Sequence, residues 1–250
     1  MTLQFAPPPA MFPRLTDDAR AAALSRMFAG LSAEEMLAEA LMGDLRGRIA
    51  MVSSFGAESV ALLHMVARAD PATPVIFLDT EMLFPETLAY QRDVAARLGL
   101  SDLRVIRPDG DDLTKEDPAD DLHRIDPDAC CDLRKTQPLQ SALQGFDGWI
   151  TGRKRYQSGA RAELPLFETD GAGRLKLNPL ADWEAGQAGA YIRAHDLPPH
   201  PLVARGYPSI GCAPCTSPVA DGEDPRAGRW RGAEKTECGI HFVNGKLVRG

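Results

Sequence analysis

The hydrophobic positions of this chain follow two alternating patterns, short continuous runs and runs with helical spacing. The short apolar runs predict buried strands at residues 48–53, 74–79, 103–107 and 148–152. The helical spacing predicts helices at residues 17–28, 32–45, 57–68, 85–98 and 131–143. Strands separated by helices of this length predict an α/β protein with a parallel sheet and helices on both faces. Ligands of such sheets bind at the carboxyl ends of the strands.

The pattern divides the chain into three parts. Residues 1–47 form an N-terminal helical segment, in which Ser32 and Glu35 have the spacing of a capping box. Residues 48–216 form the α/β domain, which ends in weaker signals for strands at 164–167 and 174–178 and for a helix at 182–195. Residues 217–250 are rich in Gly, Pro and charge and lack periodicity, which predicts a mobile, weakly packed tail.

Composition places the chain among ordinary globular proteins. Of its 250 residues, 44% are hydrophobic and 25% are charged, which supports a buried core and excludes wholesale disorder. No apolar run approaches the roughly 18–20 residues of a membrane span. The Pro-rich start has no basic head followed by an apolar stretch, so no secretory signal is predicted and a cytoplasmic location is expected.

The formal net charge of −7 is concentrated in one stretch. Residues 109–128 contain nine acidic residues and two basic ones, and the rest of the chain is balanced. The stretch is therefore predicted to be a solvated loop. Nucleic-acid binding is not expected, because it needs a basic excess. Local basic clusters near Arg153 and Arg226 suit a small anion.

The segment after the first predicted strand, residues 52–59, is rich in small and hydroxyl side chains. Such residues leave backbone N–H groups and a helix N-terminus open to an anion. Ser53, Ser54, Gly56 and Ser59 are therefore candidates to hold a phosphate or sulfate, although an ordinary capped turn has the same pattern. The segment has neither the Gly-Lys-Ser/Thr of a Walker loop nor the three glycines of a dinucleotide fingerprint.

The second predicted strand leads into Asp79 and Thr80. Together, the sequences SSFGAES and LDTEMLFPET resemble the PP-loop nucleotide-binding superfamily, which includes the ATP pyrophosphatases and the adenylyl-sulfate reductases. The resemblance implies that adenosine binds across these two strand ends. Taken alone, an aspartate at such a position is more often a helix cap or a turn residue.

Five cysteines in a chain without a predicted export signal point to metal ligation or catalysis rather than to disulfides. Cys130 and Cys131 are adjacent, and Cys212 and Cys215 form a CxxC that begins 81 residues after Cys131. Four thiolates favour zinc or an iron–sulfur cluster. An adjacent pair suits a cubane better, because neighbouring side chains can bind different irons. A buried free-thiol pair and a redox disulfide at the CxxC are the alternatives.

The context of these cysteines carries a more specific resemblance. The segment CCDLRKTQPL resembles the CC-x-x-R-K-x-x-P-L segment of assimilatory adenylyl-sulfate (APS) reductases, and GCAPCT resembles their G-C-x-P-C-T segment. The resemblance implies a [4Fe-4S] cluster held by Cys130, Cys131, Cys212 and Cys215. It also implies that Lys135 lies between the cluster and the substrate, where a cation offsets the charge of both.

The fifth cysteine, Cys238, stands near the end of the chain, and a lone cysteine is usually inert. However, RAGRW and ECGIH match the family's R-x-x-R-W and E-C-G-[IL]-H signatures. The resemblance implies that Cys238 is the nucleophile and that Arg226, Arg229 and His241 bind substrate. It implies a thiolate attack on the sulfur of APS, departure of AMP, and an enzyme S-sulfocysteine from which thioredoxin or glutaredoxin releases sulfite.

A basic turn follows the fourth predicted strand. Its sequence TGRKRYQS resembles the family's G-x-R-R-x-Q-S, which implies that Arg155 contacts the phosphosulfate. Lys154 stands where the family usually has arginine, and lysine is a point charge without the planar fork of a guanidinium. A solvent-exposed basic turn is the simpler interpretation of the same residues.

These motifs stand in family order from about residue 48 to residue 241. We therefore predict a homo-oligomeric member of the APS reductase family that forms sulfite for cysteine synthesis. A 3′-phosphoadenylyl-sulfate (PAPS) reductase, or an enzyme that accepts both nucleotides, is the nearest alternative, because SSFGAES departs from the S-F-S-G-A-E-D form common in APS enzymes. A zinc-stabilised adenine-nucleotide binder is a second alternative. An ATP pyrophosphatase would need an S-G-G-x-D-S loop, which the chain lacks.

Overall fold

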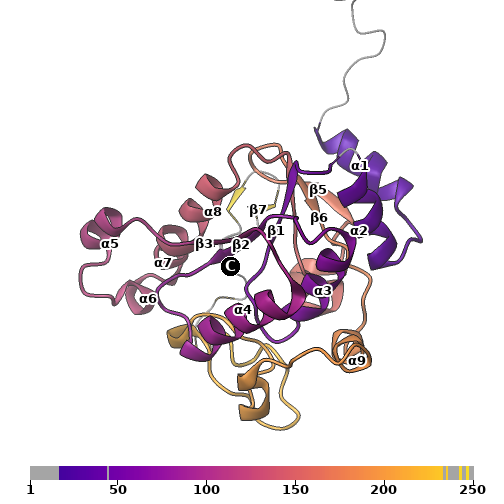
Figure 1. Cartoon of the computed structure of the whole chain (residues 1–250). Coiled ribbons are helices and arrows are strands. Elements are labelled where there is room, and N and C mark those ends of the chain that lie inside the picture. Colours follow the sequence, from indigo (N-terminus) through magenta and orange to yellow (C-terminus); the bar gives the residue numbers. More distant parts are fainter. Residues whose placement is uncertain (1–16, 44, 233–234, 236–241, 244–245, 248–250) are drawn as a thin grey trace, which may run out of the picture.

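A six-stranded sheet forms the centre of the protein in a computed structural model, which describes residues 17–43, 45–232, 235, 242–243 and 246–247 (Figure 1). Its strand order is β3-β2-β1-β4-β6-β5, and all neighbouring pairs are parallel except β5 with β6. The strands are β1 (Ile49–Val52), β2 (Val75–Leu78), β3 (Leu103–Ile106), β4 (Gly148–Ile150), β5 (Phe167–Thr169) and β6 (Leu175–Leu177). A separate antiparallel pair consists of β7 (Phe242–Val243) and β8 (Lys246–Leu247).

The described helices surround this sheet. The α-helices are α1 (Asp17–Met27), α2 (Ala33–Met42), α3 (Ser59–Ala69), α4 (Pro85–Leu98), α5 (Gly110–Glu116), α6 (Leu122–Ile125), α7 (Pro127–Cys131), α8 (Gln137–Ala142) and α9 (Gln187–Ala194). One π-helical turn, η1 (Asp132–Thr136), joins α7 to α8. The 3₁₀ turns are η2 (Arg155–Gln157), η3 (Gly159–Arg161), η4 (Pro201–Arg205) and η5 (Ala213–Cys215). No helix in the described part of the chain has both the length and the apolar character that a bilayer crossing requires.

The core lies on both faces of the sheet. Successive strand residues point to opposite faces, so Ile49 and Met51 of β1 join the large apolar cluster under α2, α3 and α4. Ala50 joins a second cluster with Leu139 and Leu143, which belong to α8 and its C-terminal end. Figure 1 shows α3 and α4 on one side of the sheet and α8 on the other. The predicted α/β architecture is therefore confirmed.

Two helix ends in the structure are formed by local features of the sequence. Ser32 accepts a hydrogen bond from the backbone of Glu35, and the Glu35 carboxylate accepts one from the backbone of Ser32, which is the predicted capping box. Gly99 ends α4 in the left-handed conformation, with φ of 66°. Both features satisfy backbone groups that a helix end leaves without partners.

The acidic stretch differs from its prediction. Residues 109–128 include α5, α6 and the start of α7 rather than a simple solvated loop. Asp117 is buried there and forms an ion pair of 2.7 Å with Arg134, which is also buried. A count of the charges within residues 109–128 does not predict this pair, because Arg134 lies outside that stretch.

Three weaker predictions shift in the structure. The helix predicted at 131–143 begins earlier and contains η1, and the strand predicted at 164–167 lies at 167–169. The helix predicted at 182–195 starts only at Gln187, because Gly186 precedes it with φ of 85°. A residue in that conformation cannot continue a right-handed helix.

Candidate active site

A cavity of about 600 Å³ opens at the carboxyl ends of β1, β2 and β4. Ser53 directly follows β1, Thr80 stands two residues after β2, and Thr151 directly follows β4. Parallel strands end at the same edge of the sheet, which brings these distant positions together. The predicted substrate-binding residues that line the cavity are Ser53, Ser54, Gly56, Ser59, Thr80, Lys135, Arg226 and Arg229.

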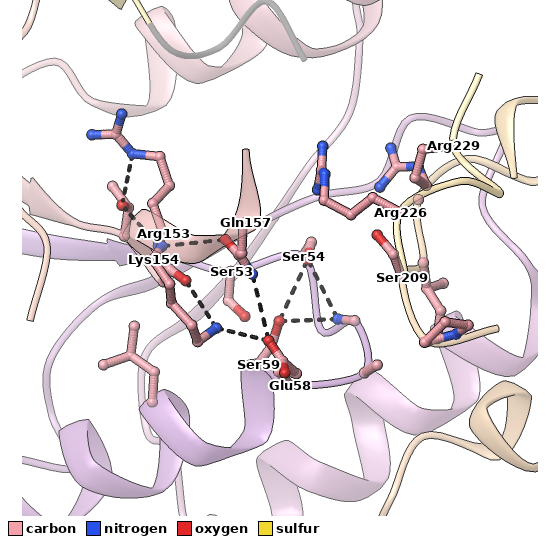
Figure 2. Close-up of a pocket in the computed structure, with 18 of the residues that line it drawn as sticks. Ser53, Ser54, Glu58, Ser59, Arg153, Lys154, Gln157, Ser209, Arg226 and Arg229 are labelled. Atoms are coloured by element: carbon pink, nitrogen blue, oxygen red, sulfur yellow. Dashed lines mark hydrogen bonds and ion pairs between the residues drawn. The ribbon is translucent and has the colours of Figure 1, made fainter. Parts of the chain in front are cut away.

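The loop between β1 and α3 forms one wall of this cavity. The backbone N–H of Gly56 donates to the Ser59 hydroxyl at 3.1 Å, and the hydroxyls of Ser54 and Ser59 lie 3.4 Å apart (Figure 2). Ser53 accepts a hydrogen bond from the backbone of Phe55 at 3.2 Å. Phe55 has φ of 48° and a fully buried ring. Such strain persists only where the surroundings fix it, so the loop presents its hydroxyls in a defined shape.

Glu58 connects this loop to the basic turn after β4. Its carboxylate accepts hydrogen bonds from Lys154 Nζ at 2.9 Å and from Gln157 Nε2 at 3.5 Å (Figure 2). It also accepts one from the Tyr156 hydroxyl at 3.2 Å. Burial lowers the pKa of Lys154, and the Glu58 carboxylate opposes that shift. Glu58 is therefore the charge partner of Lys154, and its carboxylate offsets the positive charge of the lysine.

Two arginines form the opposite wall. Figure 2 shows Arg226 and Arg229 across the cavity from Arg153 and Lys154. The Arg229 guanidinium lies 4.4 Å from the centre of the Trp230 ring, a cation–π contact. It also packs on Gly211, where an added Cβ would come within 2.3 Å of Arg229 Nη2. The cavity wall formed by Arg226 and Arg229, the cationic wall, therefore packs against Gly211, the residue before the CxxC.

The segment with these arginines is joined to the CxxC turn by its backbone. The N–H of Trp230 donates to the carbonyl of Cys215 at 3.0 Å, and Thr216 forms an antiparallel bridge with Arg229. Trp230 is buried. Residues 228–230 therefore pack against the CxxC turn, whereas residues 220–225 are exposed. The mobility of residues 217–250 stays a prediction.

Two of the predicted substrate contacts lie outside the cavity lining. Arg155 donates to the Leu164 carbonyl at 2.8 Å and pairs with Asp182. Asp79 is buried and pairs with Arg107 at 2.9 Å. The adjacent residues Lys154 and Thr80 line the cavity instead.

The four predicted cluster ligands meet around a second, smaller cavity of about 10 Å³. It is lined by Cys130, Cys131, Cys212 and Cys215 together with Met82, His123, Pro127, Arg134 and Lys135. Burial raises the pKa of Cys130 to about 11, and the nearby Cys212 thiol adds to the rise, while Arg134 opposes it. Among the described residues, no group of three or more His, Cys, Asp or Glu side chains has an arrangement that could hold a metal ion.

The chemistry of this donor set nevertheless fits a thiolate-bound centre. Both cysteine motifs, far apart in sequence, contribute both of their cysteines to the lining of the same cavity. Soft thiolate ligands select iron–sulfur clusters and zinc. Arg134 and Lys135 stand beside the sulfurs, where cations offset the negative charge of thiolates.

The two cavities are neighbours, because Lys135 and Cys212 line both of them. Lys135 Nζ lies 3.9 Å from Cys131 Sγ, and Thr80 Oγ1 lies 3.2 Å from Cys212 Sγ. The lysine therefore stands between the thiol cavity and the larger cavity, and its role between a cluster and the substrate stays a prediction.

Some candidate residues lie outside the described residues, and others were not predicted. Cys238 and His241 belong to the first group, and their roles stay predictions. Glu58 was not singled out, because its importance depends on contacts with residues about a hundred positions later. His123 has no ligand spacing to any cysteine in the sequence, and only the fold brings it to the thiols.

A parallel sheet with a hydroxyl-rich loop after its first strand, and a cavity at the strand ends, is consistent with the fold of PP-loop nucleotide-binding proteins. The model of the phosphoadenosine phosphosulfate reductase domain matches residues 48–218. The chain belongs to this family.

Three similar proteins illustrate the relationship. A protein of Chelativorans sp. (strain BNC1) named adenosine 5′-phosphosulfate reductase is 51% identical over 215 residues, which cover 85% of this chain and 87% of that protein. A Gloeobacter violaceus protein named phosphoadenosine 5′-phosphosulfate reductase is 44% identical over 225 residues, 87% of this chain and 92% of that one. The crystal structure of PAPS reductase from Candida auris, a phosphate complex, has a TM-score of 0.69 at 29% identity, and covers 83% of this chain and 99% of its own.

Proposed function

We propose that this protein reduces adenylyl sulfate to sulfite and AMP in assimilatory sulfate reduction. The observation that carries the proposal is that the nucleotide-sized cavity and the four-thiol cavity share Lys135 and Cys212. Relatives named adenosine 5′-phosphosulfate reductase, 51% and 49% identical, support this substrate.

The cofactor that we propose is a [4Fe-4S] cluster held by Cys130, Cys131, Cys212 and Cys215. The adjacent pair favours a cluster over a single ion, because neighbouring thiolates reach different irons more readily than the same one. A cluster bound there would supply a charge centre beside the substrate cavity. Lys135 would offset the charge of that centre and of the substrate together.

The sulfur chemistry that we propose needs one thiolate and one dithiol reductant. The Cys238 thiolate attacks the sulfur of APS, an S–S bond forms, and the S–O bond breaks as AMP leaves with its electron pair. One thiol of thioredoxin or glutaredoxin then attacks the Cys238 sulfur and expels sulfite. The second thiol of the reductant resolves the mixed disulfide, so the dithiol is oxidised and sulfur(VI) becomes sulfur(IV).

The cavity supplies what this displacement needs. The leaving group is a phosphate, which departs readily only when its charge is stabilised. The loop between β1 and α3 offers the hydroxyls of Ser54 and Ser59 and the helix N-terminus, and Arg226 and Arg229 offer positive charge from the opposite wall (Figure 2). These fixed groups hold the nucleotide while the thiol approaches its sulfur.

A labelling experiment tests the covalent step. The protein is purified under anaerobic conditions, analysed for iron and inorganic sulfide, and incubated with ³⁵S-labelled APS without reductant. We expect label on the wild-type chain, release of that label as sulfite by thioredoxin, and no label on the Cys238→Ser variant. A Cys238→Ser variant that still forms sulfite at the wild-type rate would contradict the proposal, and zinc in place of iron and sulfide would favour the zinc-stabilised nucleotide binder.

PAPS is the second candidate substrate. The relatives from Gloeobacter violaceus and Candida auris are named as PAPS reductases, and the SSFGAES loop leans toward the form found in PAPS enzymes. Comparison of kcat/KM for APS and PAPS decides between them, because specificity is the ratio of these two values. A higher value for PAPS would reverse the assignment, and similar values would indicate an enzyme that accepts both nucleotides.

A further inference from the structure

One residue that lines the thiol cavity has a buried polar atom with no role in the function proposed so far. His123 lines the cavity together with the four cysteines. Its Nδ1 atom is buried and has no hydrogen-bond partner among the residues that the structure describes. Buried polar groups in proteins nearly always have a partner, and each exception calls for an explanation. Because His123 lines the same cavity as four thiols, a sulfur is the nearest class of partner that this cavity offers.

The other cationic donor groups of this cavity have partners already. Arg134 donates to Asp117 and Asp120 at 2.7 Å each and to the Thr80 carbonyl at 3.1 Å. Lys135 Nζ lies 3.9 Å from Cys131 Sγ. His123 is therefore the lining side chain with a buried nitrogen that the described residues leave unsatisfied.

The fold holds His123 at this place through one buried carboxylate. Asp117 Oδ2 accepts the Arg134 guanidinium at 2.7 Å, and Asp117 Oδ1 accepts the backbone N–H of Leu122 at 2.9 Å. Leu122 is the first residue of α6, and His123 follows it. Arg134 belongs to η1, the turn that continues the helix with Cys130 and Cys131. The same carboxylate therefore ties the histidine and the adjacent cysteines together.

We propose that Nδ1–H of His123 donates a hydrogen bond to a sulfur of the metal centre that the four cysteines hold. This inference rests on the cofactor assigned above and adds a residue to that site. It also gives the acidic stretch a purpose, because residues 109–128 deliver His123 and its buried anchor to the thiols. Hydrogen bonds to the sulfurs are among the factors that set the reduction potential of an iron–sulfur centre.

The test compares two substitutions of His123 in the full-length protein, purified without oxygen. His123→Leu removes the donor, and His123→Asn keeps an N–H close to the position of Nδ1. His195→Leu is the control, because His195 lies at the end of α9, outside both cavities. Iron and sulfide content, the midpoint potential of the centre and its rate of bleaching by oxygen are measured for each.

We expect His123→Leu to keep the wild-type iron and sulfide content but to have a more negative midpoint potential and severalfold faster bleaching. A donor stabilises the reduced, more negative centre, so its loss disfavours reduction. His123→Asn should restore most of both values, and His195→Leu should match the wild type. A purely structural role of His123 would not move the potential in this donor-dependent way.

Three results would overturn the inference, and they are distinguishable. Identical potentials and bleaching rates for wild type and both His123 variants would exclude the hydrogen bond but leave the cluster in place. Loss of iron from both variants, with unchanged melting of the metal-free proteins, would make His123 a ligand instead. Wild-type protein without inorganic sulfide would overturn the cluster itself, and with it this inference.

Discussion

At the scale of single residues, Gly211 shows how a missing side chain shapes the site. The Arg229 guanidinium lies where a Cβ of residue 211 would be, with Nη2 only 2.3 Å from that position. No heavy atoms approach so closely without a bond, so any other residue at 211 must displace the guanidinium. The displaced group is the end of a flexible side chain, and its movement therefore alters binding more than folding.

We expect Gly211→Ala to weaken AMP binding about tenfold, which corresponds to about 1.4 kcal/mol. The reason is that the substitution moves the Arg229 cation away from its place on the cavity wall. Isothermal titration calorimetry of the holoprotein with AMP measures the change. Gly110→Ala is the matched control, because an added Cβ at residue 110 meets nothing within 4 Å. Wild-type affinity in Gly211→Ala would show that Arg229 does not contact the nucleotide.

At the scale of elements, the predictable parts are those with local causes. The capping box at Ser32 and the helix predicted at 85–98 depend on residues close together in the sequence, and the structure has both. The strand ends that line the cavity were also predictable, because a βαβ pattern puts all parallel strand ends on one edge. The loop residues Ser54 and Ser59 followed from this geometry.

The unpredicted parts depend on partners that are distant in sequence. The acidic stretch was expected to be solvated, but Asp117 is buried because Arg134 reaches it across the fold. Arg155 matched a motif, yet Asp182 holds it outside the cavity lining. A pattern of residue types does not reveal which of several neighbouring charges will find a partner inside the protein.

The Asp117–Arg134 pair gives the next prediction. We expect Asp117→Asn to lower the free energy of unfolding by about 3 kcal/mol at pH 7, because it leaves the Arg134 charge buried with a weakened partner. Urea denaturation of the holoprotein measures the change. Asp112→Asn is the control, because Asp112 forms only an exposed pair with Lys115, and it should cost at most about 1 kcal/mol. Equal effects of the two substitutions would contradict a special role for the buried pair.

The same pair predicts a pH dependence. Burial alone would raise the pKa of Asp117, but hydrogen bonds from Arg134 and the Leu122 backbone outweigh it and hold that pKa below its usual value. The stabilisation is therefore fully present above the usual aspartate pKa of about 4 and is lost as the pH falls through the lowered folded-state value. The stability difference between wild type and Asp117→Asn should stay constant from pH 7 to pH 5 and shrink below about pH 4. A difference that grows on acidification would contradict this assignment.

At the scale of the whole molecule, the chain gathers its chemistry at one edge of the sheet. The hydroxyl-rich loop near residue 53, the thiols at 130 and 212, and the arginines at 226 and 229 border two adjoining cavities. The colour sequence in Figure 1 shows how the C-terminal part of the chain runs back past α4. The proposed nucleophile, Cys238, must reach this edge from a segment that begins at the cationic wall.

Lys235 is the last residue before Cys238 that the structure describes, and its side chain has defined contacts. Its side chain is 6% exposed, pairs with Asp128 and donates to the Pro127 carbonyl at 3.2 Å, both at the start of α7. Cys238 follows Lys235 by three residues in the sequence, and three residues of chain span at most about 11 Å. The ion pair therefore holds the attachment point of the proposed nucleophile next to the helix that carries Cys130 and Cys131.

This anchoring predicts a rescue by charge exchange. We expect Lys235→Asp and Asp128→Lys each to slow the transfer of ³⁵S label from APS to Cys238 severalfold, with AMP affinity unchanged, because only the position of the thiol is affected. The double variant with both substitutions should recover much of the rate, since the pair is re-formed with reversed charges. Glu223→Gln is the control, because it breaks the Glu223–Arg231 pair of the same segment, whose side chains are 35% and 46% exposed, and it should leave the rate unchanged. If the double variant transferred label no faster than the slower single variant, or if AMP affinity fell in parallel with the rate, the pair would be a stabilising contact of the fold and not an anchor for Cys238.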